Sequence, residues 1–276
     1  MAITAKDVNK LRQMTGAGMM DCKKALTEAE GDFEKAVELL RKKGQKVSAS
    51  RADRETSEGV VFAKTNDTHT EGALVAFTCE TDFVAKNEEF MSLGNQIAEL
   101  AFASKPDSIA ALYEMQMGDL SVKEKIVELT GKIGEKLEVK EMQVVSGDAV
   151  IPYIHSNAKL GVLVALKNTN GSSVEEAGKD VAMQIAAMNP VAVDKDGVDP
   201  AIVEKEIEIG KEQARQEGKP ENIIEKIALG KLNKFYKENT LLSQAFVKDN
   251  SQTIAQYLDG VSKGLTVSEF KRLSIG

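Results

Sequence analysis

The stretch VVFAKTNDTHTEGALVAFTCETDFVAKNEEF, residues 60–90, does most to decide the fold. Two apolar runs, Val60–Ala63 and Ala73–Phe77, flank a polar turn at Asn66–Thr70, and this pattern predicts a β-hairpin. Apolar residues at helical spacing then begin at Val84 and continue beyond the quoted stretch. The local order is therefore a hairpin followed by a helix.

The same order recurs further along the chain. Strand patterns at residues 137–145, 150–154 and 160–166 precede a helical pattern at residues 174–188. We interpret this as a weak internal duplication that rests on element order and not on residue identity. It predicts an α+β core of two similar subdomains, expected at residues 55–140 and 141–276.

The first 54 residues have a different character and predict a three-helix module. Thr4, Asp21 and Asp32 are the expected helix caps, and we expect the third helix to close near Gly44. This region holds 12 basic and 8 acidic residues, whereas the whole chain has a net charge of −7. Residues 46–58 are polar and read as a linker or as a continuation of the third helix.

Residues 199–238 predict an antiparallel helical hairpin that interrupts the second subdomain at about 190–240. Asp199-Pro200 gives a cap followed by proline at the first helical position, and Gly218-Lys219-Pro220 gives the turn. A hairpin that protrudes must cover its apolar stripe, and another subunit is one way to do so. A short helix at residues 253–258 and a strand at residues 265–267 are expected to follow.

Composition bounds the class of protein. With 276 residues, 42% of them hydrophobic, the chain fits a globular protein of about two domains. Two cysteines are too few for a disulfide framework and favour a reducing, cytoplasmic location. The acidic balance argues against direct nucleic-acid binding. The absence of an apolar signal at residues 1–6 and of a long apolar run argues against secretion and a membrane role.

Signals for covalent chemistry are weak. Thr15–Gly18 is glycine-rich but lacks the flanking residues of a phosphate-binding loop, so we interpret it as a helix–helix turn. The histidines, His69 and His155, have no zinc-site spacing, and the cysteines, Cys22 and Cys79, read as packing residues. We therefore expect no enzyme activity, no cofactor and no metal site.

Two segments carry apolar residues where polar ones are expected. Met19 and Met20 follow a loop; one of them is explained by a hydrophobic staple, but both do not easily point inward. At the strand-to-helix junction, one interpretation has Thr81 or Asp82 cap the helix while Phe83 fills the core. The other interpretation has Asp82 and Phe83 stand at the tip of the junction, where they anchor a partner.

These segments resemble the bacterial translation elongation factor Ts family. Residues 15–26, TGAGMMDCKKAL, are similar to its N-terminal signature, and residues 79–85, CETDFVA, are similar to its second signature. The segments at residues 132–135, 161–165 and 218–220 also fit, and the resemblance covers essentially the whole chain.

The resemblance implies a guanine-nucleotide exchange factor that promotes GDP release from the GTPase elongation factor Tu during protein biosynthesis. It further implies a ubiquitin-associated-like N-terminal module and a hairpin of the dimerisation type, with a homodimer or a 2:2 complex as possible assemblies. Some family members carry a further C-terminal helical module. We expect no contact from such a module here, since the sequence ends at Gly276, soon after the last expected strand.

The resemblance also implies which residues touch the GTPase. Thr81, Asp82, Phe83 and Val84 match the segment implicated in displacing Mg²⁺ from the partner. The remaining matches are Met19 and Met20 toward the nucleotide domain, Ile133 and Gly134 toward the phosphate side, and His155 and Val247 from less distinctive segments.

Two other classes of function remain open at this point. A non-catalytic adaptor would bind helical or ubiquitin-like partners through residues 1–54. A thiol-dependent enzyme would require Cys79 to have a depressed pKa and to be reactive.

Overall fold

Two three-stranded antiparallel sheets lie at the centre of the computed structural model, which describes residues 3–276. Met1 and Ala2, part of the start considered above, lie outside the described residues. The strand orders are β1-β2-β5 and β10-β7-β6. The strands are β1 (Glu58–Thr65), β2 (Glu71–Cys79), β5 (Glu138–Ser146), β6 (Ala149–Ile154), β7 (Leu160–Lys167) and β10 (Thr266–Ser274).

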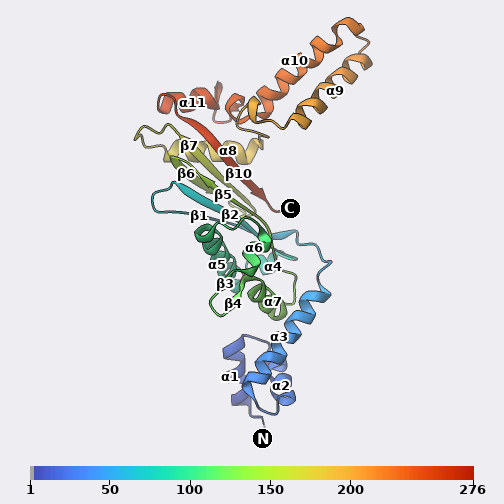
Figure 1. Ribbon diagram of the computed structural model, residues 1–276, viewed down its shortest axis with the longest axis vertical. Coiled ribbons are helices and arrows are strands. Elements are labelled where there is room, and N and C mark those ends of the chain that lie inside the picture. Colours follow the sequence, from blue (N-terminus) through green and yellow to red (C-terminus); the bar gives the residue numbers. More distant parts are fainter. Residues whose placement is uncertain (1–2) are drawn as a thin grey trace.

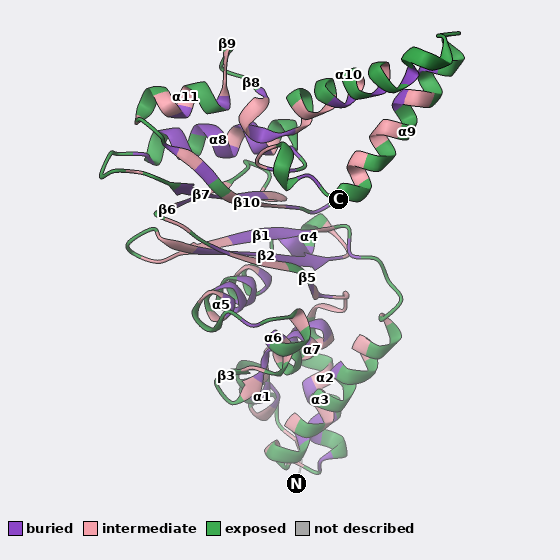
Figure 2. Cartoon of the chain, turned by 45° about the horizontal axis from the view of Figure 1, so that its top comes forward, coloured by how far each residue is buried: buried purple, intermediate pink, exposed green. Residues whose placement is uncertain are grey.

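The two sheets pack face to face, and helices cover their outer faces (Figure 2). Alternate residues of one strand therefore enter different cores: Val60 and Phe62 of β1 pack under the helices, while Val61 faces the other sheet. Because both faces of each sheet are covered, the central strands β2 and β7 consist of nearly continuous apolar runs and not of an apolar–polar alternation.

Helices α4–α7 lie on the chain between β2 and β5, and α5 and α7 supply much of the first core. Helices α8 and α11 pack on the second sheet. The bounds are α4 (Asp82–Ala85), α5 (Glu88–Ser104), α6 (Ile109–Glu114), α7 (Val122–Ile133), α8 (Glu175–Met188) and α11 (Ile254–Val261). Short elements are β3 (Gln116–Met117), β4 (Leu120–Ser121), β8 (Ala245–Phe246), β9 (Asp249–Thr253) and the 3₁₀ turns at Lys195–Gly197 and Leu241–Ser243.

The α+β class is confirmed, and both sheets share one topology. In each, a hairpin is followed by helices and then by a third strand that pairs with the second strand of the hairpin. The expected boundary between residues 140 and 141 falls inside β5, which pairs with β2 along most of its length. Strand β5 thus belongs wholly to the first sheet.

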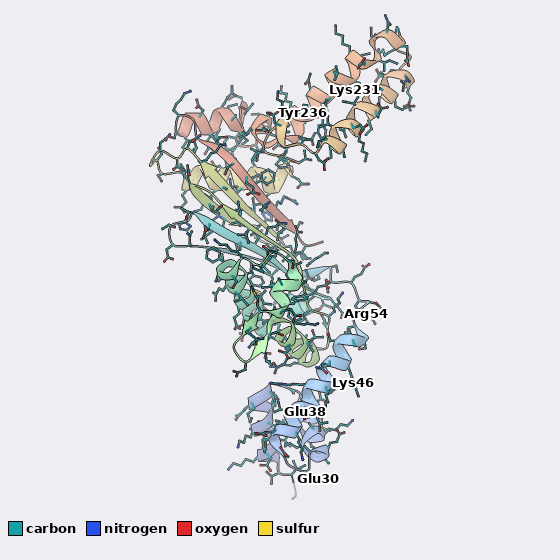
Figure 3. The ribbon with its side chains drawn as sticks, viewed as in Figure 1. Glu30, Glu38, Lys46, Arg54, Lys231 and Tyr236 are labelled. Carbon is teal, nitrogen blue, oxygen red and sulfur yellow. The ribbon has the colours of Figure 1, made fainter. Side chains whose placement is uncertain are left out.

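The N-terminal helices are α1 (Ala5–Thr15), α2 (Met19–Glu28) and α3 (Phe33–Ser50). Two expected boundaries are wrong. Asp21 is not a cap, because α2 begins two residues earlier after Gly18. Gly44 does not end α3: the helix continues over the polar residues that follow, to Ser50, and Gly44 is buried inside it against Gly131 of α7. Lys46 and Arg54 mark the path from these helices back to the core (Figure 3).

Two further differences have local causes. The single helix expected from Val84 onward is two helices, α4 and α5, because the side chain of Asn87 accepts hydrogen bonds from Glu89 N and Phe90 N and starts a new helix. The last strand, β10, is longer than expected. A β-bulge between Val267 and Glu269 breaks the alternation there, so the sequence pattern ends early although the strand does not.

The expected helical hairpin is present as α9 (Pro200–Gln216) and α10 (Glu221–Asn239), with Asp199 as the cap of α9. It extends away from the sheets at the end opposite the N-terminal helices (Figure 1). Gly210 of α9 allows close approach to Ala228 of α10. Lys231, labelled in Figure 3, donates hydrogen bonds to Gln213 and Glu217 across the pair, at 2.8 and 3.3 Å.

Candidate functional site

The junction between β2 and α4 presents an aromatic ring to solvent. Phe83 is 82% exposed, so the interpretation that it fills the core is wrong. The two residues after it, Val84 and Ala85, are buried in the first core and fix the base of the helix. Asp82 forms an ion pair with Lys86 at 2.8 Å, and the hydrogen bond and charge of that lysine lower the pKa of the Asp82 carboxyl. An acid and a ring thus stand side by side on the surface.

Glu135 holds the residue that precedes this pair. Thr81 occupies the backbone cap position of α4, but its side chain makes no capping hydrogen bond. Instead, the Thr81 N–H and hydroxyl donate to the two carboxylate oxygens of Glu135, at 3.0 and 2.7 Å. The capping role expected for Thr81 or Asp82 is therefore absent, and a contact between distant segments replaces it.

Glu80 makes the converse contact. Its carboxylate accepts the Lys136 N–H at 2.7 Å, and Arg51, just beyond α3, pairs with the same carboxylate at 2.9 Å. Burial opposes the charged form of Glu80, but these donors outweigh it and lower the pKa of the carboxyl. We call the contacts among Glu80, Thr81, Glu135 and Lys136 the reciprocal clamp, because each segment holds a backbone N–H of the other.

Ile133 and Gly134 lie directly before the clamp, at the end of α7. Ile133 is half-buried against the first core. Gly134 ends the helix with φ 83°, and no group of residues 3–276 lies within 4 Å of the position where its Cβ would be. The backbone at this turn is therefore open on one side. The structure brings these two residues into one region with the Asp82–Phe83 pair.

His155 lies in the exposed turn between β6 and β7, where Tyr153 contacts its ring nitrogen at 2.9 Å. This turn lies beside α4. Ala158 packs against the core that contains Val84, and Lys159, after Lys86, contributes to the lowered pKa of Asp82. The structure thus adds the His155 turn to the same region.

Met19 and Met20 lie elsewhere, in the first turn of α2. They are 56% and 74% exposed, so neither is buried as a staple. Figure 1 places α2 among the N-terminal helices, well separated from α4 along the long axis of the molecule. These methionines form a second exposed apolar group.

Val247 forms a third group, in the turn between β8 and β9. Its side chain is exposed, and its N–H donates to Gln184 of α8 at 2.9 Å. The next residue, Lys248, pairs with the nearly buried Asp180 at 2.6 Å. Figure 2 places β8 and β9 on the outer side of α8, away from α4. The predicted contacts are therefore distributed over three separate parts of the chain.

The buried thiol at the junction is unsuited to nucleophilic chemistry. Burial, together with the negative charge of Glu135, raises the pKa of Cys79 to about 12, and its sulfur lies 3.2 Å from the Thr81 carbonyl oxygen. This contradicts the thiol-enzyme alternative, which requires a depressed pKa. Within residues 3–276 there is no group of three or more His, Cys, Asp or Glu side chains placed to hold a metal ion.

No helix among the described residues combines the length and apolar character needed to cross a bilayer.

The arrangement of Glu80, Glu135 and Arg51 was not predicted from the sequence. Glu80 and Glu135 lie within the quoted motifs, next to the residues singled out, but 54–56 positions separate the contacting segments. Only their presence inside two distinctive motifs offered a signal.

Comparisons with known proteins agree across the whole chain. A family profile described as Elongation factor TS matches residues 80–276. Elongation factor Ts of Cytophaga hutchinsonii is 61% identical over 274 residues, which cover 99% of both chains. Elongation factor Ts of Amoebophilus asiaticus is 56% identical over 276 residues, which cover 100% of both chains. The match includes the N-terminal helices, which the family profile does not cover.

Proposed function

Because the chain belongs to the elongation factor Ts family, we propose that it releases GDP from elongation factor Tu by inserting Asp82 and Phe83. Members of the family are guanine-nucleotide exchange factors that act in translation elongation, and they catalyse no covalent chemistry. The resemblance carried by the two sequence motifs is confirmed. Similarity over the full length favours this function over an adaptor that uses residues 1–54 alone.

The observation that carries the mechanism is the exposure of Phe83. A ring that is 82% exposed in the free protein has apolar surface to bury when a partner binds. Burying a phenylalanine side chain contributes roughly 1.5–3 kcal/mol. Speeding nucleotide release a thousandfold requires the barrier to fall by about 4 kcal/mol. One ring together with the adjacent Asp82 carboxylate therefore supplies a large part of what exchange requires.

The binding free energy that Phe83 and Asp82 supply must favour the nucleotide-free conformation of the GTPase. An exchange factor accelerates release only if it binds that shape more tightly, and nucleotide then weakens the binding of the factor by the same ratio. We infer that Phe83 enters between helices of the partner and displaces the ligands of its Mg²⁺. Because Mg²⁺ requires near-ideal octahedral geometry, a small displacement is enough to weaken it.

The other exposed groups supply binding. Met19 and Met20 lie in α2, and Val247 lies in the turn between β8 and β9; both elements are distant from α4 (Figures 1 and 2). These exposed residues extend the contact without entering the nucleotide site. Ile133 and Gly134 lie beside the junction and, in this proposal, face the phosphate side of the partner, while the neighbouring His155 turn adds a further contact. Their contacts hold the ring in place while nucleotide leaves.

Replacement of Phe83 by alanine tests the mechanism. We expect the rate of labelled GDP release from elongation factor Tu to fall far more than the affinity for the nucleotide-free GTPase. Because the ring is exposed, the free energy of unfolding should change by less than about 0.5 kcal/mol. Equal losses of exchange rate and affinity would identify Phe83 as an ordinary interface residue.

The helical hairpin suggests an assembly. We propose that a second copy of the chain covers Ile209, Ile223 and Leu229, which α9 and α10 leave exposed, to give a homodimer or a 2:2 complex with the GTPase. Sedimentation equilibrium of the wild type and of Leu229→Glu measures this. A wild-type chain that stays monomeric at all concentrations, with and without the GTPase, would contradict it.

A further inference from the structure

We propose that Glu135 is a positioning residue for nucleotide exchange, which keeps the Phe83 ring in the orientation that enters the partner. The inference rests on the proposed function of Phe83 and adds a residue that does not itself insert. Its basis is the reciprocal clamp, in which Glu135 accepts two hydrogen bonds from Thr81, two residues before the ring.

The helix that carries the ring cannot orient it alone. Helix α4 has only four residues and no side-chain cap, and a single helical turn is unstable in isolation. The exposed ring of Phe83 makes little contact with its own chain. Val84 and Ala85 anchor the far side of the turn in the core. Orientation on the near side must therefore come from whatever holds Thr81.

Glu135 provides that hold with both of its oxygens. One oxygen accepts the Thr81 N–H at 3.0 Å, and the other accepts the Thr81 hydroxyl at 2.7 Å. Hydrogen bonds to an ionised carboxylate are roughly twice as strong as neutral ones. Because the two bonds involve both the backbone and the side chain of Thr81, they fix the position and the direction of the segment.

The second half of the clamp keeps Glu135 in place. Glu80 accepts the N–H of Lys136, the residue after Glu135, at 2.7 Å. Arg51, which follows α3, binds the same Glu80 carboxylate, so the segment is also tied to the N-terminal helices. Gly134 stands on the other side of Glu135. The clamp therefore sets the spacing between the ring and the turn expected to face the phosphate side.

Loss of the reciprocal clamp should lower the maximal rate of GDP release and leave the affinity for the GTPase nearly unchanged. Contacts far from Glu135, such as those of Met19 and Val247, would still hold the partner. If the freed segment is in the inserting orientation about one tenth of the time, the maximal exchange rate falls about tenfold. The factor concentration that gives half of the maximal rate should stay within about twofold of wild type, since most of the interface is unchanged.

The experiment compares Glu135→Ala and Glu135→Gln in the full chain, with Glu141→Ala as the matched control. Glu141 is an exposed residue on β5, and among the described residues its carboxylate accepts one side-chain hydrogen bond, from Gln143 at 3.1 Å. We expect about a tenfold lower maximal rate for Glu135→Ala, a smaller loss for Glu135→Gln, whose amide oxygen still accepts one bond, and no change for Glu141→Ala. Unchanged exchange in Glu135→Ala, or a loss that appears only in the half-saturating concentration, would overturn the proposal.

A double substitution separates positioning from general damage. If Glu135 acts through the ring, Glu135→Ala has no further effect in a chain that already carries Phe83→Ala. An equal loss in both backgrounds would show that Glu135 acts by another route.

A measurement on the free protein, without the GTPase, tests the reciprocal clamp independently of the proposed function. By NMR hydrogen exchange on the free protein, the Thr81 amide should exchange at least about tenfold faster in Glu135→Ala, because its acceptor is gone. Equal exchange in wild type and variant would refute the clamp itself. If the clamp is intact and the wild type still fails to release GDP, the proposed function fails, and the exchange role of Glu135 fails with it.

Discussion

The crossing of α3 and α7 yields a quantitative prediction, because two glycines meet there with almost no space between the helices. A Cβ added to Gly131 would lie 2.5 Å from the Cα of Gly44, whereas a Cβ added to Gly44 would have the Val127 carbonyl oxygen as its nearest neighbour, at 3.3 Å. The first contact is with backbone, which cannot move aside like the end of a flexible side chain. Substitution should therefore have unequal effects at the two positions.

The magnitudes follow from two opposing effects. Alanine within a helix is favoured over glycine by roughly 0.5–1 kcal/mol. Overpacking in a tight contact costs about 1–3 kcal/mol. For Gly131→Ala the packing cost exceeds the gain, so we expect a net loss of about 1–2 kcal/mol in the contact between α3 and α7. For Gly44→Ala the two effects nearly cancel.

Gly230 of α10 provides the control. In the part of the chain that the structure describes, a Cβ added at Gly230 meets nothing within 4 Å, so Gly230→Ala should keep the gain in helix propensity without the packing cost. The expected order of stability is Gly230→Ala above wild type, Gly44→Ala close to wild type, and Gly131→Ala below it. The values for Gly44→Ala and Gly131→Ala refer to the contact between α3 and α7, and the value for Gly230→Ala refers to α10.

Native-state hydrogen exchange measures this effect locally, which matters in a chain whose parts need not unfold together. A loss of one to two kcal/mol should raise the exchange of the α3 amides by a factor of about 5–30 in Gly131→Ala. Equal protection of α3 in Gly131→Ala and Gly44→Ala would refute the reasoning. It would mean that the two helices do not meet at the glycines.

Two further predictions concern groups at the junction. The pKa of Glu80 is lowered in the folded state, so the stability from its contacts is fully present above its ordinary value of 4.5 and is lost as pH falls through the folded pKa. Thermal unfolding of wild type and Glu80→Gln should thus differ most near neutral pH and converge in acid, and a gap that widens below pH 4.5 would contradict this assignment. With a pKa of about 12, Cys79 should react with a thiol reagent at pH 8 only after unfolding, and fast labelling of Cys79 in the native chain would show that it is accessible.

Much of the secondary structure could be predicted because its causes lie within a few residues. Thr4 starts α1 with a complete capping box, and Asp199 caps α9 before its proline. The hairpin of β1 and β2 follows from two apolar runs around a polar turn. Hydrogen bonds between neighbouring residues and the spacing of apolar residues determine such features. They can therefore be recognised in the sequence alone.

Where the predictions failed, a distant segment had decided the local conformation. Gly44 has the sequence features of a helix end, yet α3 continues through it, and the glycine is buried against Gly131 of α7. The end of β10 was missed because a bulge at Val267 shifts the register against β7. Neither Gly131 nor β7 is near these positions in the chain.

The sequence by itself determined the residue types of the junction, the order of the elements around it and the family to which the chain belongs. Only the tertiary structure decided that Phe83 points to solvent, because exposure depends on which other segments cover a residue. It alone paired Glu80 with Lys136 and Glu135 with Thr81, across 54–56 positions of chain. Such pairs form when the core of β2, α5 and α7 brings two short segments together, and no local pattern records that approach.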